Sequence, residues 1–338
     1  MPYKQISSFA PSDNVGTPAF GISMALSGDE QTLIVGGNTD NSNSGAAWIF
    51  TNNNNGTFSQ YGLKLTPSDN IGKESLGTSV GISSNGQTVV IGGPNDNTNV
   101  GAVWIFNNIS GIWTQTGSKL VPSDNIGTDH IGISVAMSSD GNTLLISGSG
   151  DNTNVGAVWI FNNVAGTWTQ NGNKLLASDE TGAAQFGTSV ALSADGNTAL
   201  IGGYEDNTGV GAVWIFKNNA GTWSQYGSKL IPIYDTARLA VTTYGNSCNL
   251  SPDGHIAAIG TFLQRVDTGR VFIVGNVNPT GNWRQSGVSF LPTGTKGFCT
   301  DSVIVTPNIL LGSDYNNNDV WVYLPISVFN GYVMRRGQ

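Results

Sequence analysis

Carboxylates recur along this sequence at a fixed interval and are the residue type with the clearest potential for chemistry. A ring of carboxylates and amides on one face could hold cations or hydrogen-bond sugar hydroxyls. The favoured interpretation is structural, because Asp and Asn cap their own backbone in Asx turns. In the first series, aspartates recur every 55 or 56 residues: Asp13, Asp69, Asp124, Asp179 and Asp235. The second series lies in Asn-rich segments and consists of Asp40, Asp96, Asp151 and Asp206.

Arginine departs from this repetition. All six arginines of the 338-residue chain lie from Arg238 onward. Guanidinium groups with aromatic neighbours suit carboxylates, phosphates or acidic sugars. The alternative is a diverged repeat whose turn residues became solvated charges. We predict a ligand-binding site formed by the following residues: Tyr234, Asp235, Arg238, Arg265, Asp267 and Arg270.

Residues suited to catalysis are few. An enzyme needs a positioned acid, base or nucleophile, but the two histidines, His130 and His255, belong to different repeats. The four glutamates are spread over loops and turns, and a serine that recurs at one strand position indicates a structural role. We therefore predict a non-catalytic protein with no cofactor and no metal. A hydrolase with a central-channel site, built from Asp301 and the arginines above, is a minor alternative.

An internal repeat supplies the elements that position these residues. Each unit divides into four short apolar runs separated by turn residues, which is the pattern of a four-stranded β-propeller blade. The aromatic residue in the third run is expected to lie in the core between blades. In four units this aromatic residue is the tryptophan of a Gly-Ala-(Ala/Val)-Trp tetrad, at spacings of 56, 55 and 55 residues: Trp48, Trp104, Trp159 and Trp214. Two weaker copies of the motif have Phe272 and Trp321 at this position.

The predicted fold class is all-β: a single six-bladed β-propeller of four-stranded antiparallel blades, forming one domain over residues 3–338. Residues 8–13 match residues 119–124, the end of a fourth strand. Residues 3–10 are therefore expected to complete the last blade and close the ring, although the tail 331–337 competes for that edge. The units cover residues 17–66, 73–121, 128–176, 183–231, 241–291 and 297–338.

An acidic turn joins the first two strands of most units, as in SADGN at residues 193–197. Calcium needs roughly six to eight oxygen ligands, which alternating carboxylates supply, and these turns hold at most two acidic residues. Asp-Gly and Asn-Gly pairs are preferred in tight hairpins. We interpret the turn as a corner between strands and not as a metal loop.

A Phe-Gly pair stands at residues 20–21 and 186–187, and a Gly-Gly-Pro element stands at residues 92–94. With these elements the repeated unit resembles the FG-GAP repeat of integrin α-chain propellers. The resemblance covers nearly the whole chain and implies a β-propeller used for binding or scaffolding. Calcium-binding members carry alternating Asp and Asn ligands in the turn described above. This chain lacks them, so the calcium sites are not carried over.

Composition limits the partners. Charged residues make up 11% of the chain and the net charge is −8, which argues against nucleic-acid binding because that needs a basic surface. No secretory signal and no membrane-spanning apolar stretch is visible, so we expect cytoplasmic synthesis, with incorporation into a particle or surface assembly as an option. We predict a binding or scaffold module that contacts a protein or glycan ligand through its loop face, as in adhesion. The alternative is a structural component of a larger assembly, such as a virion or cell-surface layer.

Overall fold

The computed structural model describes residues 8–54, 57–232, 243–263, 268–276, 283–285, 298–306, 309–314 and 319–323. The chain divides into two compact units, which we describe separately: unit 1 is Met1–Thr153 with Val158–Lys174, and unit 2 is Asn154–Ala157 with Leu175–Gln338. Within the described part of the chain, no helix has the length and apolar content needed to cross a membrane.

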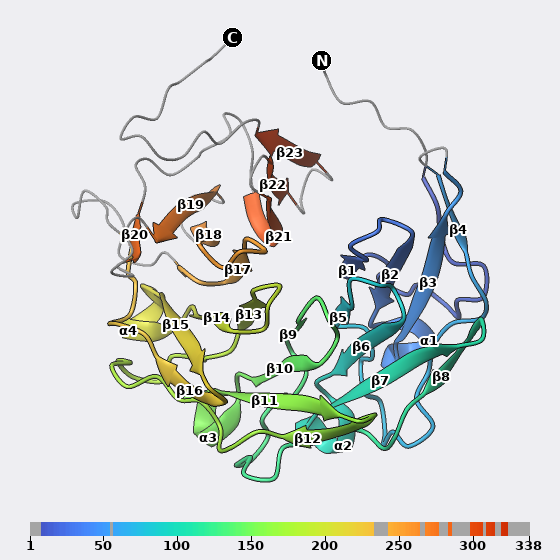
Figure 1. The fold of residues 1–338 in the computed structure, drawn as a ribbon, viewed down its shortest axis with the longest axis horizontal. Coiled ribbons are helices and arrows are strands. Elements are labelled where there is room, and N and C mark those ends of the chain that lie inside the picture. Colours follow the sequence, from blue (N-terminus) through green and yellow to red (C-terminus); the bar gives the residue numbers. More distant parts are fainter. Residues whose placement is uncertain are drawn as a thin grey trace. The chain divides into compact units, whose positions relative to one another are not determined.

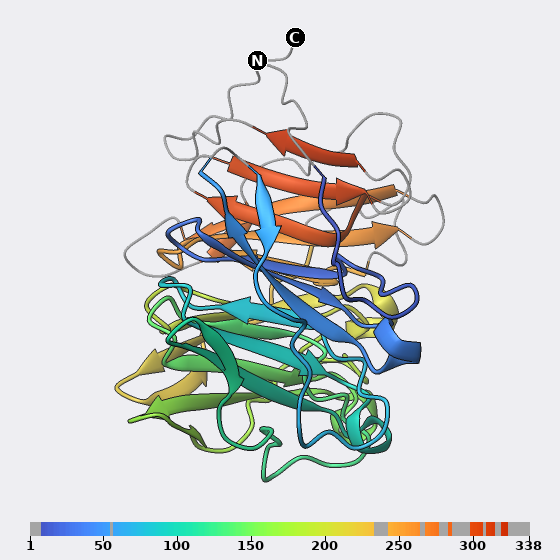
Figure 2. The ribbon, with the colours of Figure 1, turned by 90° about the vertical axis from the view of Figure 1, so that its right-hand side faces the viewer.

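Unit 1 contains three four-stranded antiparallel sheets whose strands follow chain order, and the first two lie side by side in both views (Figures 1 and 2). The third sheet includes one residue of unit 2, at the start of its third strand. The strands are β1 (Ser23–Leu26), β2 (Thr32–Gly37), β3 (Ala46–Asn52) and β4 (Phe58–Gln60); β5 (Ser79–Ile82), β6 (Thr88–Gly93), β7 (Ala102–Ile109) and β8 (Ile112–Gln115); and β9 (Val135–Met137), β10 (Thr143–Gly148), β11 (Ala157–Val164) and β12 (Thr167–Gln170).

Unit 2 continues the pattern. Its strands are β13 (Ser189–Leu192), β14 (Thr198–Gly203), β15 (Ala212–Asn219) and β16 (Thr222–Gln225); β17 (Ser247–Leu250), β18 (Ile256–Leu263), β19 (Thr268–Asn276) and β20 (Trp283–Gln285); and β21 (Phe298–Thr306), β22 (Ile309–Asp314) and β23 (Asp319–Tyr323). The predicted repeat of four-stranded antiparallel sheets is confirmed for five sheets, and the sixth has three strands among the described residues. The predicted closing strand, residues 3–10, lies largely outside the described residues.

The third strand of each repeat is the most deeply buried element. Its first five residues are buried in β3, β7, β11 and β15, because neighbouring chain segments cover both faces of the strand. The central tryptophan is 0% exposed in all four strands. The predicted core role of Trp48, Trp104, Trp159 and Trp214 is therefore confirmed.

The Asn-rich segments form four short left-handed turns: α1 (Asp40–Asn43), α2 (Asp96–Asn99), α3 (Asp151–Asn154) and α4 (Asp206–Gly209). The two central residues of each turn have φ between 47° and 60°. The first of the two is Asn in all four turns, and Asn adopts this conformation at low cost; the second is Ser or Thr. The first residue of each turn is a buried Asp.

The acidic turns work as corners. Asp195 Oδ1 accepts hydrogen bonds from the Ser193 hydroxyl at 2.5 Å and from the Asn197 N–H at 3.0 Å. Neighbouring sheets also join here, since the Gly28 N–H donates to the Ser84 carbonyl at 2.9 Å. The carboxylate is used inside its own turn, as the corner interpretation requires.

Candidate functional site

The first carboxylate series links the strands of each sheet. Asp69 Oδ1 accepts from Trp104 Nε1 at 2.8 Å and from Gln115 Nε2 at 3.0 Å, and its Oδ2 accepts from the Lys119 N–H at 2.8 Å. Burial alone would raise the pKa of Asp69, but these hydrogen bonds outweigh it and lower the pKa. The same bonds recur around the equivalent residues Asp13, Asp124 and Asp179.

The second series forms buried ion pairs. Asp96 is 0% exposed and accepts from Lys119 Nζ at 2.5 Å and from the Ile71 N–H at 2.6 Å. Asp235 lies outside the described residues. Every other carboxylate of the two series has an architectural partner, so ligand binding by these series stays a prediction. The equivalent ion pairs are Asp40–Lys64, Asp151–Lys174 and Asp206–Lys229.

Most residues of the predicted arginine-centred site lie outside the described part of the chain. Tyr234, Asp235, Arg238, Arg265 and Asp267 lie outside the described residues. Arg270 lies in β19, where its backbone pairs with Thr261 of β18. This site stays a prediction.

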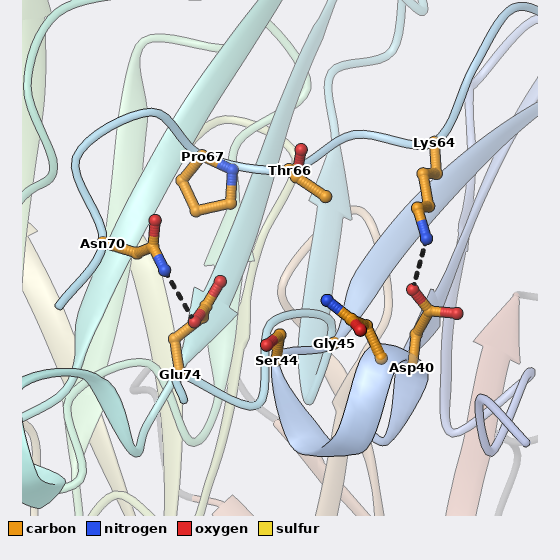
Figure 3. Close-up of a pocket in the computed structure, with 9 residues that line it drawn as sticks. Asp40, Ser44, Gly45, Lys64, Thr66, Pro67, Asn70 and Glu74 are labelled. Carbon is orange, nitrogen blue, oxygen red and sulfur yellow. Dashed lines mark hydrogen bonds and ion pairs between the residues drawn. The ribbon is translucent and has the colours of Figure 1, made fainter. Parts of the chain in front are cut away.

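A pocket of about 220 Å³ lies in unit 1 between α1 and the segment that joins β4 to β5. Figure 3 shows two polar pairs on opposite sides of it: Lys64 with Asp40, and Asn70 with Glu74. Ser44 lies between the pairs in this view, with Thr66 across from it. Among the described residues, no group of three or more His, Cys, Asp or Glu side chains is arranged to hold a metal ion.

Glu74 is the pocket residue with the most unusual environment. It is 2% exposed, and its Oε2 accepts a hydrogen bond from Asn70 Nδ2 at 3.0 Å. Burial raises the pKa of Glu74, and the nearby charge of Asp96 adds to the rise, while the Asn70 bond and the Lys119 charge oppose it. A carboxyl group shifted towards neutrality inside a pocket is a candidate acid–base group.

Sequence reasoning missed Glu74 because it treated the glutamates as loop residues. A comparison of the repeats with one another could have identified Glu74. In the first, third and fourth repeats the equivalent residues are Pro18, Asp129 and Ala184. The residue at this position therefore changes between repeats, whereas the carboxylates of both series recur in all four. A residue that changes from unit to unit is not needed by the common architecture.

Two further loops each contain one carboxyl group that, like that of Glu74, is at least partly buried. Asp129 is 0% exposed, and Glu180, which replaces the Asn70 position, is half-buried. Burial raises the pKa of both. Asp129 Oδ1 and Glu180 Oε2 are buried and have no hydrogen-bond partner among the described residues. Near Asp129, however, Val100 and Val121 stand at the repeat positions that Ser44 and Thr66 occupy beside Glu74.

The raised pKa of Glu74 predicts a pH-dependent cost to stability. Its contribution to stability is fully present below the unfolded-state pKa of about 4.3 and is lost as the pH rises through the folded-state pKa. Glu74→Gln removes the titrating group. The stability of this variant relative to the wild type should therefore rise between about pH 4 and about pH 8, as measured by urea unfolding at both pH values. Parallel pH profiles of the two proteins would contradict the assignment.

Two segments of the chain match a known repeat family, at residues 113–161 and 168–216. Both matches start at the tryptophan of a fourth strand and end in the third strand of the next sheet. These segments are FG-GAP repeats. The resemblance argued from the sequence is confirmed, and the FG-GAP repeats span the bonds from Asp124 to Trp159 and from Asp179 to Trp214. A comparison with curated proteins finds no match.

Three of the solved structures similar to this chain are propeller enzymes of low sequence identity. The periplasmic gluconolactonase of Pseudomonas aeruginosa has a TM-score of 0.59 and 15% identity over 89% of this chain and 80% of its own. The hydrazine synthase of Kuenenia stuttgartiensis has a TM-score of 0.52 and 14% identity over 96% and 99%. The GH74 xyloglucanase of Xanthomonas campestris has a TM-score of 0.52 and 13% identity over 94% and 46%. At these identities the likeness shows the fold.

These neighbours correct the prediction of a non-catalytic binding or scaffold protein, because enzymes share the fold over nearly the whole chain. The prediction counted acids and bases along the sequence and noted only that the glutamates are spread over loops and turns. In the structure Glu74 is desolvated inside a pocket. Burial, which the inventory of residue types could not include, is what makes a carboxyl group chemically useful.

Proposed function

We propose that this protein is a hydrolase of carboxylic esters or lactones, with Glu74 as the general base. The observation that carries the proposal is the position of Glu74: a buried carboxyl group of raised pKa that lines a pocket. A general base works best when its pKa lies near the working pH. Two of the similar structures, a gluconolactonase and a xyloglucanase, bear the names of hydrolytic enzymes and lend support.

The proposed reaction uses two pocket residues. Glu74 accepts a proton from a water molecule whose oxygen attacks the carbonyl carbon of the substrate. The bond to the leaving oxygen then breaks, and Glu74 returns the proton to that oxygen, giving an acid and an alcohol. Lys64 supplies positive charge for the oxyanion. One of its three N–H donors is directed at Asp40, which leaves two for the substrate.

Glycoside hydrolysis by a pair of carboxyl groups fits this pocket less well. It would need Asp40 as the second acid or nucleophile. Asp40 Oδ1 already accepts from the Val15 N–H at 2.6 Å, and Oδ2 accepts from Lys64 Nζ at 2.6 Å. The equivalent Asp residues make the same two bonds in three other repeats, which marks the bonds as architectural.

Glu74→Gln tests the proposal. It keeps the shape of the side chain and the contact with Asn70 but cannot accept a proton from water. We expect kcat for a panel of p-nitrophenyl esters and six-membered lactones to fall by about 10²- to 10⁴-fold. In the wild type, kcat/KM should fall below the folded-state pKa of Glu74, because the base must be ionised.

Asp129→Asn is the matched control for this test. Asp129 stands at the same repeat position, is buried and also has a raised pKa, but it is not part of the pocket that Glu74 lines. Its activity should stay within about twofold of the wild type. Equal activity of Glu74→Gln and the wild type would reject Glu74 as the base. Turnover of glycosides without turnover of esters would reject the substrate class.

We also propose that the six sheets form one six-bladed propeller completed by residues 3–10. The support is the sixth sheet, which has three strands among the described residues, and the match of residues 8–13 to the end of a fourth strand. The arginine-centred group would then be a second ligand site for an anion, in a different repeat from the Glu74 pocket.

A further inference from the structure

We infer that the substrate of the Glu74 pocket carries several hydroxyl groups and that Ser44 and Thr66 recognise them. This inference rests on the proposed hydrolytic role of Glu74, which it extends from a type of bond to a class of substrate. A polyhydroxylated lactone or ester is the expected substrate.

The first support comes from comparing the repeats with one another. Ser44 is replaced by valine in the next three repeats, and Thr66 is replaced by an aliphatic residue in each of them. Both hydroxyls therefore stand where the architecture tolerates, and elsewhere uses, apolar side chains. The residues at the two positions are Val100, Val155 and Val210, and Val121, Leu176 and Ile231.

The second support is unused hydrogen-bonding capacity in the pocket. Ser44 is half-buried and Thr66 is exposed, and neither hydroxyl has a hydrogen-bond partner among the described residues. Asp40 and Glu74, by contrast, each already accept a hydrogen bond from another pocket residue, Asp40 from Lys64 and Glu74 from Asn70. Two free hydroxyls on the pocket wall can each donate and accept one hydrogen bond with a substrate hydroxyl.

The third support is chemical selectivity. A site that hydrogen-bonds substrate hydroxyls disfavours the analogue that lacks them. An apolar ester would be better served by the valine pair of the neighbouring repeat. Ser44 has a φ of −67° and Val100 a φ of −63°, so the backbone at this position accommodates either residue, and the serine is not required by the turn.

The experiment compares two lactones that differ only in their hydroxyl substituents, glucono-δ-lactone and δ-valerolactone. The variant Ser44→Val with Thr66→Val installs the residues of the next repeat. Two neutral hydrogen bonds are lost, so kcat/KM for glucono-δ-lactone should fall by about tenfold to a hundredfold. The value for δ-valerolactone should stay within about twofold.

The reciprocal variant Val100→Ser with Val121→Thr is the control, since these positions do not line the pocket. It should leave both lactones unaffected. The single variants Ser44→Ala and Thr66→Ala, each expected to lose part of the effect, keep the test decisive if the double variant folds poorly. Equal kcat/KM for both lactones in the wild type, or an unchanged preference in the folded variants, would overturn the inference while leaving the hydrolytic role intact.

Binding of D-glucitol, which has hydroxyls but no carbonyl to hydrolyse, separates the two proposals. Isothermal titration calorimetry should detect it in the wild type and show at least about tenfold weaker binding in the double variant. Loss of glucitol binding together with no hydrolysis of either lactone by the wild type would refute the proposed hydrolysis and support hydroxyl recognition. Glucitol binding that survives the double substitution would count against Ser44 and Thr66.

Discussion

Lys119→Met should lower the free energy of unfolding by about 3 kcal/mol, because it leaves a buried carboxylate without its cation. Asp96 is 0% exposed, and Lys119 Nζ lies 2.5 Å from its Oδ2. Methionine keeps most of the apolar stem, so lost packing contributes little. The backbone N–H of Lys119, which Asp69 uses, is unaffected. Urea unfolding followed by tryptophan fluorescence measures the change.

The companion variants separate charge burial from other effects. Lys119→Met with Asp96→Asn removes both charges and should be more stable than Lys119→Met alone, since the stranded carboxylate is gone. Lys73→Met removes a lysine from the exposed loop before β5 and should change stability by less than about 0.5 kcal/mol. If Lys119→Met cost no more than Lys73→Met, the four ion pairs would not be structural supports.

The repeat made the sheets predictable. Each unit copies the same apolar runs and turn residues, so the position of Trp104 in β7 follows from spacing and alternation alone. The hydrogen-bond partners of Asp69 and Asp96 could not be predicted from spacing and alternation. The sequence shows that both residues recur, but the bond from Trp104 to Asp69 joins positions 35 residues apart, and only the folded sheet brings them together.

The Glu74 pocket escaped prediction for a different physical reason. Its value lies in the burial of Glu74 and in the arrangement of Glu74, Ser44 and Thr66 around one pocket, and neither follows from residue type alone. The repeat nevertheless offers a usable rule. Positions that are constant across units, such as Asp96, belong to the architecture, whereas positions that differ in one unit, such as Ser44, are candidates for function.

Gly92→Ala should be strongly destabilising although it adds a single methyl group, because two neighbouring sheets touch through this residue. A Cβ at Gly92 would lie 2.1 Å from the Gly132 carbonyl oxygen and 2.4 Å from the Ser79 hydroxyl, which donates to that carbonyl at 2.7 Å. The same approach recurs between Gly36 and Gly77 and between Gly202 and Gly245, so the repeat depends on it.

Relief of the clash requires the backbone of one sheet to move away from the next, since the obstructing atom is a carbonyl oxygen and not a flexible side chain. We expect a loss of at least about 3 kcal/mol, at the upper end for overpacked cores, together with loss of the Ser79 hydrogen bond. Gly81→Ala is the matched control. Gly81 lies on the adjacent strand β5, and three other repeats have alanine at this position (Ala25, Ala136 and Ala191). The nearest atom to the added methyl group would be a side-chain methyl of Val90. Near-UV circular dichroism and urea midpoints should separate the two variants, and equal midpoints would mean that the sheets have room to part.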